Sequence, residues 1–105
     1  MNEGSLDGLG LIAYTSITKG ACMPLYLDVH HKIDGLKAEA LGHAHQKDLE
    51  VQHKYGVHYL RYWYDEGTGK VFCLVEAPSK EAAAAVHREA HGLVADEIIE
   101  VKEGA

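Results

Sequence analysis

The chain has 105 residues, which is enough for one domain with a single modest core. Its net charge is -6 with histidine counted as neutral, and this argues against binding to a nucleic-acid backbone, which needs clustered Lys and Arg. No stretch approaches the roughly 20 apolar residues of a transmembrane helix. The two cysteines, Cys22 and Cys73, form neither a disulfide framework nor a paired zinc motif. We therefore expect a cytoplasmic protein with no nucleic-acid or membrane partner.

The N-terminal segment, residues 1–22, is rich in Gly, Ser and Thr and has weak periodicity. We interpret it as a flexible leader or a start-site artefact, because Met23 could itself be the first residue. Residues 23–105 then form the one expected domain.

Alternation and turn residues predict the elements of that domain in chain order. In "PLYLDVHH", residues 24–31, apolar side chains alternate with Tyr, Asp and His, as in a strand with one apolar face. Later segments show helical periodicity or strings of β-branched and aromatic residues. They predict a helix over 36–55 that ends at Gly56, a strand over 57–66, a strand over 70–77, a helix from the cap Ser79 to about Leu93, and a strand over 96–103.

This order is the β-α-β-β-α-β order of the ferredoxin-like fold, an α+β class. It predicts a four-stranded antiparallel sheet with two helices on one face. The opposite face is then uncovered, and we expect Tyr26, Trp63 and Tyr64 to lie on or near it. An aromatic sheet face usually packs against a second copy. We therefore expect a homodimer of the dimeric α+β barrel type, joined through this open sheet face.

Eight histidines make histidine the unusual residue of this composition. On a helical wheel of the first helix, Asp48 falls within the apolar stripe, and His45 lies at the edge of that stripe. A buried carboxylate must be paired, protonated or bound to metal. By contrast, His43 and His53 point toward water and are expected to be ordinary surface groups.

The second helix carries His87 and His91 at i and i+4, which places two imidazoles on one helix face. Because the two helices lie side by side in this fold, their polar edges could converge. We therefore predict a metal site from five residues: His30, His45, Asp48, His87 and His91. Such N/O ligands suit Ni²⁺, and Zn²⁺, Cu²⁺ or Co²⁺ are also compatible.

Simpler explanations exist for each of these residues. Asp48 could bond to a backbone amide or a lysine, the pair on the second helix could be exposed without a role, and His30 could lie in the dimer interface. Cys73 is more often a small buried hydrophobe than a thiolate ligand. The sequence leaves open whether a further group contributes ligands: His31, His43, His53, His58 or Cys73.

Several motifs resemble those of a known family, and they extend from Met23 to about Gly104. They read "MPLYLDVHH", "AHQKDL", "GVHYLRYW", "GKVFCLVEAPSKEAA" and "VHREAHGLVADEIIEV". The chain resembles the small actinobacterial nickel-binding, nickel-responsive proteins, formerly a domain of unknown function. The resemblance implies a ferredoxin-like homodimer that binds nickel and has no established catalytic activity. The matching polar positions are His30, His45, Asp48, Cys73, His87 and His91.

Three functions are compatible with the sequence. The first is a nickel buffer or sensor that acts as a homodimer with His/Asp sites. The second is a small-molecule enzyme of the dimeric ferredoxin-like class, with Asp48 and His45 or His87 as a general base pair. The third is a regulatory interaction module. The sequence contains no nucleophile motif or phosphate loop, so we expect a metal-binding protein rather than an enzyme.

Overall fold

The structure, a computed structural model, describes residues 23–104. Its elements follow the predicted order and are, in sequence, β1 (Leu25–His30), α1 (Ala38–Val51), the 3-10 helix η2 (Gln52–Tyr55), β2 (His58–Asp65), β3 (Lys70–Glu76), α2 (Lys80–Ala90) and β4 (Glu97–Val101). The predicted β-α-β-β-α-β order is therefore confirmed. The expected leader, residues 1–22, lies outside the described residues, so the domain boundary stays a prediction.

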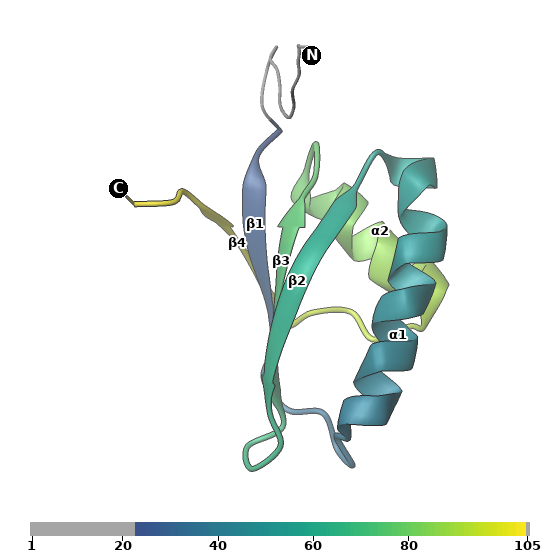
Figure 1. The fold of residues 1–105 in the computed structure, drawn as a ribbon. Coiled ribbons are helices and arrows are strands. Elements are labelled where there is room, and N and C mark those ends of the chain that lie inside the picture. The colour runs from purple at the N-terminus through teal and green to yellow at the C-terminus, as the bar shows by residue number, and fades with distance from the viewer. Residues whose placement is uncertain (1–22, 105) are drawn as a thin grey trace, which may run out of the picture.

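The four strands form one sheet in the order β2-β3-β1-β4, and every neighbouring pair is antiparallel. Both helices cover the same face of this sheet, and Figure 1 shows the other face without a covering element. The predicted α+β architecture, with two helices on one face, is confirmed. Within residues 23–104, neither helix has the length and apolar character needed to cross a membrane.

Local sequence signals explain where the helices start and stop. The Ser79 side chain accepts a hydrogen bond from the backbone N–H of Ala82 at 3.1 Å and so caps the start of α2. Gly56 has a φ of 66° and ends η2 as predicted. Gly92 has a φ of 83°, which a helix cannot continue through, so α2 ends at Ala90 and not at Leu93. His91 is thus the residue that caps the end of the helix.

Strand β1 is the reverse of a simple amphipathic strand, because its polar side chains are on the buried face. Tyr26, Asp28 and His30 are buried beneath the helices, and the apolar residues between them face the uncovered side. The expectation that Tyr26 lies on the open face is therefore wrong. Tyr64 pairs with the buried Val71 and shares the helix-covered face, so its expected position is also wrong. Trp63 is 49% exposed and does lie on the open face.

The core fills the layer between the sheet and the helices. Its fully buried members include Val57, Val75, Ala83 and Val86. Ala83 and Val86 of α2 are fully buried, and His87 of the same helix faces Asp28 on β1.

Candidate metal centre

Among residues 23–104, four polar or charged residues are buried between these apolar side chains: Asp28, His30, Asp48 and His87. They come from three elements, since Asp28 and His30 lie on β1, Asp48 lies on α1 and His87 lies on α2. Each is at most 6% exposed. Burying such groups is costly unless they satisfy one another or bind an ion. Their convergence therefore marks the candidate site.

His87 is the centre of the cluster because each of its ring nitrogens faces a different carboxylate. Its Nδ1 lies 2.9 Å from Asp48 Oδ1, and its Nε2 lies 2.9 Å from Asp28 Oδ2. The Tyr59 ring stacks on the imidazole, with 4.6 Å between ring centroids and an angle of 26° between planes. The imidazole is thereby held in one plane between α1 and β1.

Two overlapping sets of donor atoms result. The inner group consists of Asp28, His30, Cys73 and His87, and all four residues are buried. The outer group consists of Asp48, His87 and His91. Within each group, one donor atom from every residue lies within 4.8 Å of the others. Each group therefore has the spacing that a single metal ion requires.

The sheet register creates the inner group. Cys73 on β3 is the direct partner of Asp28 on β1, so their side chains lie next to each other on the helix-covered face. His30 follows Asp28 by two residues and points to the same face. His30 Nε2 lies 3.6 Å from Asp28 Oδ1. Burial and the neighbouring Asp28 carboxylate raise the pKa of the Cys73 thiol, which is therefore protonated in the metal-free protein.

The charged groups of the cluster stabilise one another in their ionised forms. Burial alone would lower the pKa of the His87 imidazolium, but the two carboxylates at its nitrogens raise it to about 9. Burial would likewise raise the pKa of Asp28, but His30 and His87 hold it well below its usual value. The pKa of Asp48 is lowered in the same way by His87 and His91, against the opposing effect of burial. Without metal, His87 is thus a cation between two carboxylates.

Tyr59 adds a hydroxyl to the inner group. Its Oη lies 3.0 Å from Asp28 Oδ2 and 3.1 Å from the carbonyl oxygen of Ala83. A phenol has one proton, so it can donate to only one of these acceptors at a time. Burial, followed by the Asp28 carboxylate, raises the pKa of Tyr59. The hydroxyl is therefore a donor to the site and not an anionic ligand.

Two buried side-chain atoms of the described residues have no hydrogen-bond partner: Asp28 Oδ1 and His87 Nε2. Both belong to the inner group. The contact of His87 Nε2 with Asp28 Oδ2 is close but lacks hydrogen-bond alignment. Beside them lies a cavity of about 30 Å³, lined by residues that include His30, Cys73, His87 and His91. A cavity of this size accommodates a water molecule or an ion.

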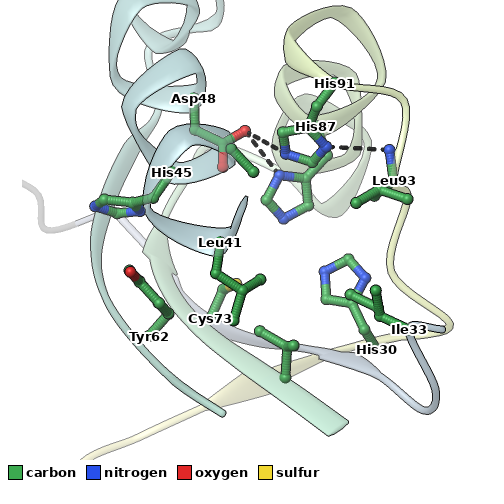
Figure 2. Close-up of a pocket in the computed structure, with 12 residues that line it drawn as sticks. His30, Ile33, Leu41, His45, Asp48, Tyr62, Cys73, His87, His91 and Leu93 are labelled. Atoms are coloured by element: carbon green, nitrogen blue, oxygen red, sulfur yellow. Dashed lines mark hydrogen bonds and ion pairs between the residues drawn. The ribbon is translucent and has the colours of Figure 1, made fainter. Parts of the chain in front are cut away.

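The structure brings together four of the five residues predicted from sequence: His30, Asp48, His87 and His91. His45 lines the same cavity but belongs to neither donor group. Its ring lies 4.9 Å from that of Tyr62, and Figure 2 shows it apart from the His87 and His91 rings. The ligand role of all five residues stays a prediction.

Sequence reasoning missed Asp28 as a site residue and left Cys73 open. A local signal for Asp28 did exist, because Asp and His at i and i+2 of a strand must share a face. The pairing of Asp28 with Cys73 depends on the register of β1 and β3, which the 44 residues between them do not reveal. Tyr59 also gave no signal, because it resembles the other aromatic residues of its strand.

Fold and site together define a small α+β protein with a buried His/Asp/Cys group that could hold a metal ion. Comparison with known proteins agrees with this description. A family profile described as "Nickel responsive protein SCO4226-like" matches residues 26–101. The chain belongs to this SCO4226-like, nickel-responsive family.

A solved structure gives independent support. The chain is similar to the crystal structure of SCO4226 from Streptomyces coelicolor A3(2), with 42% sequence identity and a TM-score of 0.72. The match covers 77% of this chain and 99% of that chain. A comparison with curated protein sequences returned no match.

Proposed function

We propose that this protein binds nickel as a buffer or sensor, that it acts as a homodimer, and that the inner group holds the ion. The donors would be Asp28 and His30 from β1, Cys73 from β3 and His87 from α2. Membership of a nickel-responsive family supports the metal. Of the residues predicted from sequence, this proposal keeps His30 and His87 as ligands.

The observation that carries the proposal is the pair of unpartnered buried atoms, Asp28 Oδ1 and His87 Nε2. Buried polar atoms in folded proteins nearly always have partners, and an unpartnered atom costs roughly 1–3 kcal/mol. A cation within the inner group would satisfy both atoms at once. No rearrangement of the backbone is needed, because the four donors already lie within 4.8 Å of one another.

The chemistry of the donors limits the choice of metal. Two imidazoles, one carboxylate and one thiol form a nitrogen- and sulfur-containing set, which favours Ni²⁺, Cu²⁺, Zn²⁺ or Co²⁺ over Mg²⁺ and Ca²⁺. With both acids of the inner group ionised, Asp28 and Cys73 would balance the two positive charges of such an ion. A neutral site is the arrangement that a buried position tolerates best.

The enzyme alternative has less support from the geometry. Substrate pockets generally measure about 300–1,000 Å³. The cavity at the His/Asp cluster measures about 30 Å³. It would admit a metal ion or a water molecule but not an organic substrate.

A homodimer would cover the open face of the sheet. The strand register places many apolar side chains on this face, together with the charged Arg61, Glu76 and Glu97. The apolar residues are Leu25, Leu27, Trp63, Phe72, Leu74, Ile99 and Val101. Trp63 and Ile99 are 49% and 46% exposed in the single chain. Contiguous apolar surface of this kind usually marks an interface, and a second sheet is its simplest complement.

Calorimetric titration of the chelator-stripped, tag-free protein tests the metal proposal. Ni²⁺, Zn²⁺, Co²⁺ and Cu²⁺ would each be added at about pH 7.5, where an unperturbed imidazole is mostly neutral. We expect tight nickel binding at a whole-number stoichiometry. The double variant His30→Ala/Cys73→Ser should lose at least tenfold in affinity, because it removes two of four donors.

Surface histidines provide the matched control, because they are also imidazoles but lie away from the cluster. The double variant His43→Ala/His53→Ala alters two exposed residues of α1 and η2. It should retain wild-type nickel affinity. If instead it abolishes binding while the inner-group variant binds normally, the ion is held on the surface and the proposed site is wrong.

A further inference from the structure

We infer that Asp48 is a positioning residue: it accepts the Nδ1 proton of His87 and thereby directs the lone pair of Nε2 into the inner group. The inference rests on the proposed function and assigns a role within that same site. It gives Asp48 a different role from the ligand role predicted from sequence.

The two nitrogens of His87 have different surroundings. Nδ1 makes a 2.9 Å hydrogen bond to Asp48 Oδ1, whereas Nε2 lies 2.9 Å from Asp28 Oδ2 without the alignment of a hydrogen bond. A neutral imidazole has one N–H and one lone pair, and the bond made by one nitrogen fixes the role of the other. With the proton on Nδ1, the lone pair of Nε2 is free to face Asp28, His30 and Cys73.

His91 is held in the outer group by contacts at both of its ring nitrogens. The backbone N–H of Leu93 donates to His91 Nδ1 at 3.1 Å, so the proton of a neutral His91 lies on Nε2. That nitrogen is 3.0 Å from Asp48 Oδ1. Figure 2 shows the two imidazoles converging on the one carboxylate. Asp48 Oδ1 thus accepts a hydrogen bond from His87 and lies close to the His91 ring.

This contrast between the groups distinguishes the ligand role of the inner group from the positioning role of Asp48. A metal ion bound to Asp48 Oδ1 would displace its hydrogen bond with His87 and its close contact with His91, whereas an ion in the inner group would satisfy two atoms without hydrogen-bond partners. A carboxylate that orients a ligating histidine is a recurring feature of metal sites, and its removal commonly costs 10–100-fold in metal affinity. The position of Asp48, 3% exposed and behind His87, fits this role.

Nitrogen-15 NMR of the histidine rings tests the inference. The tautomer of His87 would be read first in the metal-free protein at about pH 10.5, above its pKa of about 9, and then in the Zn²⁺-loaded protein near neutral pH. We expect an Nδ1–H tautomer in the metal-free wild type and Zn²⁺ on Nε2. In Asp48→Asn, the amide can donate to Nδ1, so the proton should move to Nε2 and nickel affinity should fall 10–100-fold.

Two further variants keep the test decisive. Glu50→Gln makes the same carboxylate-to-amide change at an exposed position of α1 and should alter neither tautomer nor affinity. His91→Ala keeps the carboxylate but removes its second partner, so it should keep the Nδ1–H tautomer and lose less affinity than Asp48→Asn.

Each outcome has a distinct meaning. If the wild type has the Nε2–H tautomer, or if Asp48→Asn loses affinity while its His87 keeps the proton on Nδ1, Asp48 acts as a ligand or through its charge and the inference is overturned. If the wild type binds no nickel at all, the proposed function fails as well. The spectrum of the metal-free protein distinguishes these cases because it does not depend on a bound ion.

Discussion

At the scale of single residues, His87 determines how the cluster behaves without metal. The carboxylates of Asp28 and Asp48 at its two nitrogens overcome the effect of burial and raise its pKa from 6.5 to about 9. A cation between two anions stabilises the folded protein, because the unfolded chain lacks this arrangement. A nickel ion held in the proposed site would have to displace the proton on Nε2, so protons and nickel would compete for the same atom.

This shift predicts how the stability of the metal-free protein depends on pH. The folded pKa is raised, so the contribution of His87 is fully present below about pH 6.5 and is lost as the pH rises to about 9. The free energy of unfolding should fall over that interval by about 3 kcal/mol at most. Urea denaturation of the chelated protein at several pH values measures it. His87→Gln should flatten this dependence, and an equally steep decline in that variant would contradict the assignment.

Residues on helices were easier to predict than residues on strands. A helical wheel identified Asp48, His87 and His91 because 100° per residue fixes which side chains share a face. For β1 the alternation was evident, but the choice between its faces was not, and this hid Asp28. His45 lies at the edge of the same helix, yet its ring packs near Tyr62, since a wheel does not give the tilt of a helix over the sheet.

At the scale of elements, all six predicted elements are present because their caps, turns and periodicities agree. The sequence could not settle where each element ends or which face of each strand the helices cover. α2 is shorter than predicted because Gly92 takes a left-handed conformation. The β2–β3 hairpin also supports the site, since the backbone N–H of Ile33 donates to the carbonyl of Gly69 at 2.9 Å and Ile33 lines the cavity.

Two glycines with nearly equal backbone angles predict different responses to substitution. Gly69 has a φ of 80° and Gly92 a φ of 83°. A Cβ on Gly69 would lie 3.1 Å from both the N and O atoms of Ile33, whereas a Cβ on Gly92 would meet nothing within 4 Å. Gly92→Ala should cost about 1 kcal/mol from backbone strain alone, and Gly69→Ala roughly 2–3 kcal/mol. Thermal and urea denaturation would measure the stability of the two variants. Equal losses of stability would show that the contact with Ile33 adds nothing to the cost of the Gly69 substitution.

At the scale of the whole molecule, the two faces of the sheet have separate roles. The helix-covered face holds the polar cluster, and the open face presents the apolar side chains of all four strands. The sequence predicted the open face correctly from the order of elements, but of the three aromatic residues expected there only Trp63 lies on it. The face of a strand is fixed by which side the helices cover, and no local pattern encodes that choice.

This division predicts that dimerisation and metal binding can be separated by mutation. Trp63→Asp places a charge on the open face, on the edge strand β2, and should convert the proposed homodimer into monomers, as measured by sedimentation. Leu49→Asp is the matched control, because Leu49 is also partly exposed, at 37%, but lies on α1. It should leave the dimer intact. A monomeric wild type, or dissociation by the control alone, would contradict an interface on this face.

X-ray absorption at the nickel edge tests most directly whether the ion lies in the inner group. Cys73 is the one sulfur donor of that group, and Ni²⁺ bound there should show one sulfur together with imidazole nitrogens in its coordination shell. Cys73→Ser should remove the sulfur and keep the imidazoles. A shell of nitrogen and oxygen alone, unchanged by that substitution, would place the nickel elsewhere on the protein and contradict the account.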